Sequence, residues 1–305
     1  MNRATLPVLS VLIVAAVLLN GAGVSVRFAT GTPSTNPAAS KPPTSQPSYP
    51  IWDGKESVAD YAKRAGIKDA QITLALDGNV MMKLTLIPAG KFLMGGRDSS
   101  SIKSFKDEGP TREVTISRPF YMGVYEVTQA QYEPVVGRNP SNFKDPSNPV
   151  ESVSWKDAVD FCKKLSEKAG KRVRLPTEGE WEYACRAGSK TDFCCGDGYD
   201  SVLDYAWCSI NSGKKTHPVG RKKSNAWGLF DMHGNVSEWC SDYFAHSYAD
   251  AKTLDPEGPR SGTSRVSRGG GWSSGPQFCR SSNRSGLDPE VQLREYGFRV
   301  VLDLK

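Results

Sequence analysis

Histidine is scarce in this chain of 305 residues, which has only three, His217, His233 and His246. No two of them are close in sequence, so the chain lacks the paired spacing of a local histidine metal motif. A large excess of one charge is also missing, because 39 Lys and Arg against 33 Asp and Glu give a net charge of +6. Such a mild and mixed charge disfavours nucleic-acid binding, which needs a concentrated basic surface.

The chain has no internal repeat and no clear boundary inside its folded part, so we expect one domain. Apolar residues make up 38% of it, which is enough to build a packed core, while 29 Gly and 20 Pro predict a fold rich in loops. The seven cysteines are an odd number, so any set of disulfides leaves at least one thiol over.

The N-terminus has the pattern of an export signal. Arg3 precedes an uncharged apolar run over residues 6–19, and small residues follow at 20–23. We interpret residues 1–26 as a secretory signal peptide or, because the apolar run can be extended to about Val26, as an uncleaved signal anchor. The chain is therefore expected to be exported to the periplasm or the extracellular space, and to touch a membrane only if the anchor is retained.

A predicted linker follows the signal segment. Residues 27–50 are rich in Pro, Ser and Thr and are predicted to be a disordered linker, since they offer little apolar area to bury. Residues 51–83 form a lead-in segment, in which an Asp-Gly turn at Asp77 predicts a hairpin. Short strands are expected over residues 83–89, 91–94 and 113–116, and the folded domain over residues 84–305.

Three helix starts are well specified. Thr128, Ser154 and Thr177 each precede a side-chain acceptor three residues later, which is the pattern of a capping box. After Ser154, apolar residues recur at helical spacing and predict one buried stripe, formed by Ala158, Phe161, Cys162 and Leu165. Pro134 should shorten the first of these helices.

Many motifs then resemble a known family in their order along the chain. They lie at residues 87–95, 107–110, 119–128, 148–155, 174–182, 225–239, 268–272 and 297–299. Together they resemble the formylglycine-generating enzyme (sulfatase-modifying factor) family. The resemblance implies an α+β fold that is irregular, related to C-type lectins and poor in regular secondary structure. Tryptophans inside these motifs are expected mainly to fill the core, with one or two lining a groove.

The resemblance fails at the catalytic position. In competent members, two cysteines five residues apart follow an Arg-Gly-Gly motif and bind copper. The matching positions here are Ser274 and Cys279, and Gly271 stands where those enzymes carry a serine. A hydroxyl cannot replace a thiolate as a Cu(I) ligand. We therefore interpret the chain as a pseudoenzyme, while an oxidase that uses Cys279 with some other thiol stays the alternative.

A calcium-like segment is better preserved. The resemblance implies calcium in some members, with Glu238 as the side-chain ligand and carbonyls from Gly234 and Val236. A carboxylate and backbone carbonyls suit this hard cation. The alternative is that Glu238 pairs with a buried arginine.

The sequence leaves two questions open: how the cysteines pair and what three C-terminal arginines bind. By resemblance, Cys162 and Cys185 match family cysteines, but the positions of their expected partners are Val300 and Arg284. Other pairings could use Cys194, Cys195, Cys208 and Cys240, and the sequence does not choose among them. Arg280, Arg284 and Arg299 could hold a carboxylate or phosphate, although we expect them to pair with Glu126, Glu180 or Glu182.

The sequence thus predicts an exported binding or scaffold domain of this family without competent copper chemistry. Its partner would be an exported protein, peptide or glycan rather than a nucleic acid. The alternative is a copper-dependent oxidoreductase that converts a sulfatase cysteine to formylglycine through Cys279. The histidine-cluster pattern of related iron-dependent sulfoxide synthases is absent from the sequence, which disfavours that chemistry.

Overall fold

The computed structural model describes residues 48–77, 79–97 and 105–304, and the structural statements that follow concern those residues. The predicted signal segment and residues 27–47 of the predicted linker lie outside them. Residues 48–50 have no regular secondary structure, but Tyr49 packs against the apolar core. Among the described helices, none combines the length and the apolar character needed to cross a membrane.

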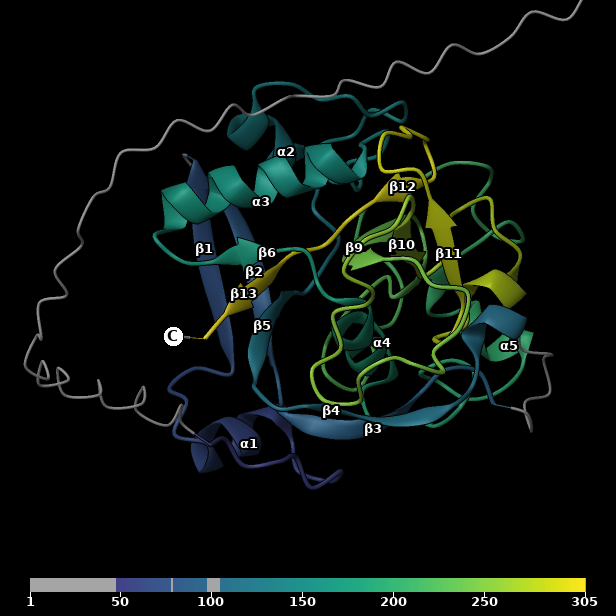
Figure 1. Ribbon diagram of the computed structural model, residues 1–305. Coiled ribbons are helices and arrows are strands. Elements are labelled where there is room, and N and C mark those ends of the chain that lie inside the picture. The colour runs from purple at the N-terminus through teal and green to yellow at the C-terminus, as the bar shows by residue number, and fades with distance from the viewer. Residues whose placement is uncertain (1–47, 78, 98–104, 305) are drawn as a thin grey trace, which may run out of the picture. The chain divides into compact units, whose positions relative to one another are not determined.

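An antiparallel sheet of five strands, in the order β1-β2-β5-β13-β6, forms the first region of the fold (Figure 1). The predicted hairpin is confirmed, since β1 and β2 pair with Leu74 opposite Met82. The last strand of the chain, β13, lies between β5 and β6, so both ends of the domain contribute to one sheet. The strands are β1 (Gln71–Asp77), β2 (Val80–Ile87), β5 (Phe120–Gly123), β6 (Val173–Arg174) and β13 (Val301–Asp303).

Helices α2 (Gln129–Val136) and α3 (Trp155–Ala169) pack together on this sheet (Figure 1). Both begin as predicted, with capping boxes at Thr128 and Ser154. The four residues of the predicted stripe are the buried residues of α3, and they join a core with Tyr132 and Phe298. Helix α2 contains Pro134 and ends two residues later, before Gly137.

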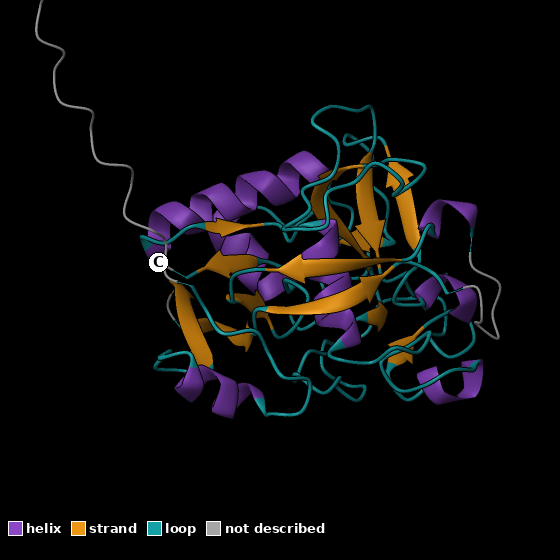
Figure 2. Ribbon diagram, turned by 60° about the horizontal axis from the view of Figure 1, so that its bottom comes forward, coloured by secondary structure: helices purple, strands orange, loops and turns teal. Residues whose placement is uncertain are grey.

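The second region consists of short elements joined by long loops, as Figure 2 shows. A sheet in the order β11-β10-β9-β12 combines antiparallel strands with one parallel pair, β9 and β12. Helix α4 (Glu178–Arg186) packs on it and starts at the predicted capping box of Thr177. The four strands are β9 (Ser237–Tyr243), β10 (Arg265–Arg268), β11 (Arg284–Leu287) and β12 (Tyr296–Gly297).

Small elements complete the described fold. The strands predicted over residues 91–94 and 113–116 lie within β3 and β4, which pair antiparallel, and β7 pairs parallel with β8. The prediction of a mixed α+β fold is confirmed. The remaining bounds are α1 (Val58–Arg64), α5 (Tyr199–Val202), the 3-10 helices η1 (Lys106–Glu108) and η2 (Pro276–Cys279), β3 (Gly90–Met94), β4 (Arg112–Ile116), β7 (Ala206–Trp207) and β8 (His233–Gly234).

Buried ion pairs fasten the second region. Each pair joins a carboxylate and a guanidinium whose side chains are at most 5% exposed. The expectation that C-terminal arginines pair with glutamates is confirmed, but the predicted partners were wrong, because the loops bring other glutamates to them. The pairs are Arg280 with Glu108, Arg284 with Glu178, Arg299 with Glu238 and Arg268 with Glu182.

Candidate functional site

The loop that carries Ser274 and Cys279 begins at the end of β10. Gly269 and Gly270 have φ values of 90° and 67°, which glycine adopts without steric cost. A Cβ at Gly270 would lie 2.7 Å from the Phe278 carbonyl oxygen and 2.9 Å from Cys279 Sγ. Glycine at this position therefore lets the chain fold back on η2 and brings the two predicted site residues into one loop, residues 271–279.

Ser274 uses its polar groups to hold this loop. Its hydroxyl accepts a hydrogen bond from the Gly271 N–H at 3.0 Å, and its own N–H donates to the Gly271 carbonyl at 2.9 Å. The Ser274 carbonyl accepts a further bond from the Ser209 N–H at 2.9 Å. The serine thus closes a turn and ties it to a neighbouring loop, a role that needs a hydroxyl and no thiol.

Cys279 lies in an apolar cluster. Its side chain is fully buried together with Phe193, Val202, Ala206 and Cys208, and its thiol donates to the Gly275 carbonyl at 3.8 Å. Burial raises the pKa of the Cys279 thiol, and nearby Cys208 adds to the shift. Cys279 is therefore a protonated thiol at neutral pH, as expected for a cysteine that packs like a small apolar residue.

These residues do not fit a copper ion. The copper chemistry needs two reachable thiolates, whereas the loop offers one hydroxyl engaged in a turn and one buried thiol. Cys208 supplies a second sulfur near Cys279, but it is also fully buried. Copper would therefore lack a reachable pair of thiolate ligands in this arrangement.

Glu238 is engaged by other side chains. Its Oε2 accepts hydrogen bonds from the Arg299 Nε and the Trp181 Nε1, both at 2.7 Å, and its Oε1 accepts one from Arg299 Nη2 at 2.7 Å. The structure thus supports the alternative prediction, in which a buried arginine, Arg299, neutralises Glu238. Both carboxylate oxygens of Glu238 therefore already accept hydrogen bonds from protein donors, and calcium at Gly234, Val236 and Glu238 stays a prediction of the sequence.

Two more carboxylates lie near this pair. Burial, followed by the negative charge of Asp231, raises the pKa of Glu126 well above its usual value. The Asp231 carboxyl is also buried, which raises its pKa to about 6. Glu126 accepts hydrogen bonds from the Asn235 side chain at 2.7 Å and the Val236 N–H at 3.0 Å. Across the described residues, no group of three or more His, Cys, Asp or Glu side chains is arranged to hold a metal ion.

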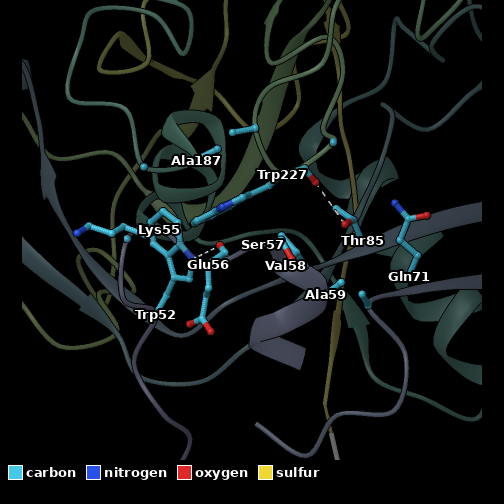
Figure 3. Close-up of a pocket in the computed structure, with 15 residues that line it drawn as sticks. Trp52, Lys55, Glu56, Ser57, Val58, Ala59, Gln71, Thr85, Ala187 and Trp227 are labelled. Carbon is cyan, nitrogen blue, oxygen red and sulfur yellow. Dashed lines mark hydrogen bonds between the residues drawn. The ribbon is translucent and has the colours of Figure 1, made fainter. Parts of the chain in front are cut away.

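An open cleft of about 820 Å³ lies elsewhere, between the lead-in segment and the domain (Figure 3). Trp52 and Trp227 meet there edge to face with ring centres 5.1 Å apart. A Cβ at Gly188 would come within 2.6 Å of the Trp52 ring, so glycine lets the lead-in segment dock closely. Trp227 thus lines a groove, whereas Trp181 and Trp239 fill the core as expected.

None of the site residues predicted from the sequence lines that cleft. Instead, an exposed aromatic pair lies beside the Ser274 loop, where the Phe105 and Phe278 rings stack with centres 5.6 Å apart. Both side chains are 41% exposed, and Ile210, the neighbour of Ser209, is 62% exposed. Sequence reasoning missed this aromatic pair, because two isolated apolar residues carry no periodic signal and only the tertiary structure brings Phe105 and Phe278 together.

Comparison with known proteins identifies similar chains. Residues 77–304 match the model of the sulfatase-modifying factor enzyme 1-like domain. The chaperone protein LppX of Paenibacillus barcinonensis is 33% identical over 68% of this chain and 86% of its own. The formylglycine-generating enzyme of Bos taurus is 31% identical over 72% of this chain and 75% of its own.

A solved structure shares the fold. Treponema denticola variable protein 1 superposes with a TM-score of 0.70 and 30% identity, over 77% of this chain and 99% of that one. The similarity confirms the predicted irregular, C-type-lectin-like fold.

Proposed function

The chain belongs to the sulfatase-modifying factor family, and within it we propose that this protein is an exported binding or scaffold domain without competent copper oxidase chemistry. The observation that carries the proposal is Ser274. It stands at the first copper-cysteine position, and its hydroxyl accepts a hydrogen bond within its own turn.

Relatives of this chain include both a chaperone and enzymes. The family includes a protein named a chaperone as well as formylglycine-generating enzymes, so family membership is compatible with either role. The burial of Cys279 further supports loss of the oxidase, because a catalytic thiolate must be reachable and ionised.

The proposed binding surface is the exposed, stacked aromatic pair Phe105 and Phe278. Exposed aromatic rings provide large contact areas at low entropic cost, and contiguous apolar groups on a surface mark interaction sites. The ligand class that fits best is an exported protein or peptide with apolar side chains, rather than a nucleic acid or a highly charged ligand.

Two measurements test the loss of copper chemistry. The purified protein should show no tight Cu(I) binding in a competition titration, and mass spectrometry should find no formylglycine in a sulfatase-type cysteine peptide after incubation with copper and oxygen. Tight binding together with conversion would overturn the proposal. The Ser274→Cys variant should gain Cu(I) affinity relative to Ser274→Ala, which separates the missing ligand from a general loss of structure.

A specific observation favours the alternative oxidase. Cys208 lies in the same cluster as Cys279, so two sulfurs are near each other. If the protein does convert the peptide, Cys279→Ala and Cys208→Ala should each abolish turnover under this alternative. Conversion that survives both substitutions would eliminate it.

The binding surface has its own test. A peptide array should identify ligands whose binding falls at least tenfold in Phe278→Ala, with Met81→Ala, an exposed apolar residue of β2 in the five-stranded sheet, as the control substitution. Equal loss in both variants, or no loss in either, would contradict the assignment of this surface.

A further inference from the structure

Two adjacent cysteines occupy the tip of a tight turn. The Phe193 N–H donates to the Gly196 carbonyl at 3.1 Å, and the Gly196 N–H donates back to the Phe193 carbonyl at 3.3 Å. These reciprocal bonds leave Cys194 and Cys195 as the two central residues. Their thiols are thus side chains of neighbouring residues at one turn.

Exposure separates this pair from the other cysteines. Cys162, Cys185, Cys208, Cys240 and Cys279 are all buried, whereas Cys194 and Cys195 are half-buried and in reach of solvent. The neighbouring Cys194 thiol lowers the pKa of Cys195 to about 6, and the Cys195 thiol donates a hydrogen bond to the Ser201 carbonyl of α5 at 3.5 Å. Cys195 is therefore the accessible thiol best suited to react as a thiolate.

His233 connects the turn to the Ser274 loop. Its Nε2 accepts a hydrogen bond from the Cys194 N–H at 3.1 Å, and its Nδ1 lies 2.7 Å from the Cys279 carbonyl. The amide can only donate and the carbonyl can only accept, so the imidazole is neutral with its proton on Nδ1. Burial lowers the pKa of His233, which agrees with this neutral form.

We propose that Cys194 and Cys195 form a thiol–disulfide exchange site that takes small disulfides as substrates. The Cys195 thiolate attacks one sulfur of the substrate, forms a mixed disulfide and releases one substrate thiolate. Cys194 then gives up its proton to solvent, attacks Cys195 Sγ and releases the second thiolate. The two cysteines lose two electrons, and the substrate disulfide is reduced to two thiols.

The product is a labile bond. Adjacent Cα atoms are about 3.8 Å apart, below the range usual for disulfides, so the Cys194–Cys195 bond is strained and easily reduced. A disulfide of this kind is reactive rather than structural. The inference is independent of the copper question, because neither cysteine occupies a copper-ligand position.

The test uses the full purified protein, reduced and then equilibrated with mixtures of oxidised and reduced glutathione. Two of the seven thiols should be lost without added denaturant, and peptide mapping should find Cys194 joined to Cys195. The Cys194→Ser variant should retain glutathione on Cys195, because the resolving thiol is missing. Cys195→Ser should lose the fast reaction.

Two results would overturn the proposal. One is a bond that joins Cys194 to buried Cys185, and the other is oxidation that requires denaturant. Cys162→Ser is the matched control in a fully buried site, and it should keep the intramolecular bond. Circular dichroism of each variant establishes that a lost reaction does not reflect unfolding.

Discussion

The two regions of this domain are stabilised in different ways. Around the five-stranded sheet, α2 and α3 bury an apolar core that includes Phe161 and Leu165. Around β9, β10 and α4, large arginines are themselves buried, and Arg268, Arg280 and Arg299 are among the largest fully buried side chains. The first region is held by apolar packing that hides little polar surface, and the second also depends on neutralising charges that it has removed from water.

Substitutions of buried side chains should therefore affect folding stability differently in the two regions. Truncating an apolar core side chain costs its transfer free energy plus a cavity term, and partial relaxation of the neighbours limits that second cost. A buried ion pair that loses one partner leaves an uncompensated charge with no access to water. Substitutions in the second region should therefore be the more damaging ones.

The largest effect is expected for Arg299→Ala, which strands Glu238 in the interior. We expect a loss of about 3–5 kcal/mol in the free energy of unfolding, measured by urea denaturation. Arg172→Ala is the control, since that side chain is 76% exposed where it pairs with Asp303. Similar losses in both variants would contradict the distinction between buried and exposed pairs.

A somewhat smaller loss is expected in the apolar region. Leu165→Ala removes a fully buried side chain of α3 and should cost about 3 kcal/mol in the same measurement. The exposed neighbour Lys164→Ala should change stability by less than about 0.5 kcal/mol. A greater loss for Leu165→Ala than for Arg299→Ala would reverse the comparison.

Helix α3 also depends on its first turn. Ser154 accepts a hydrogen bond from the Asp157 N–H at 3.1 Å, and Ser154→Ala should cost about 1 kcal/mol. Ser154→Gly should cost only a few tenths of a kcal/mol, because glycine is tolerated at a helix cap. Equal losses for the two variants, measured by thermal denaturation, would show that the hydroxyl does not act as a cap.

The smallest expected effect is a pH dependence of folding stability in the second region. Burial, with the charge of Glu178, raises the pKa of Asp242 to about 7, so the folded state holds a proton that the unfolded state has released. This contribution is complete below the unfolded pKa and is lost as the pH rises through 7. The stability of the parent relative to Asp242→Asn should fall by about 1 kcal/mol between pH 6 and pH 7.

Urea denaturation at a series of pH values checks this expectation. The exposed control Asp250→Asn should leave the pH profile of the parent unchanged. A parent stability that rises relative to Asp242→Asn over this interval would have the wrong sign and would contradict the buried, protonated state.

Local rules predicted the first region well. The capping boxes at Thr128 and Ser154 and the hairpin before Val80 depend on residues close in sequence, so their signals could be read directly. The partners of the arginines could not be predicted in the same way. Arg280 pairs with Glu108 across 172 positions, and no periodic pattern links residues that far apart.

The candidate site likewise has features that the sequence predicted and features that depend on tertiary contacts. The resemblance assigned Ser274 and Cys279 to the two copper-cysteine positions, and the structure places them in one loop. The sequence did not indicate that His233, which looked isolated, would connect Cys194 to Cys279. Nor did it distinguish the two half-buried cysteines from the five buried ones, because exposure depends on the whole fold.

The sequence by itself determined the family, the starts of the main helices and the serine at position 274, since these depend on residue identity and local spacing. Only the tertiary structure decided that Arg299 engages Glu238, that Cys279 is buried beside Cys208, and that Cys194 and Cys195 share an accessible turn. The physical reason is that charge pairing, burial and thiol reactivity depend on which distant segments exclude water together. That exclusion is a property of packing rather than of any short stretch of the chain.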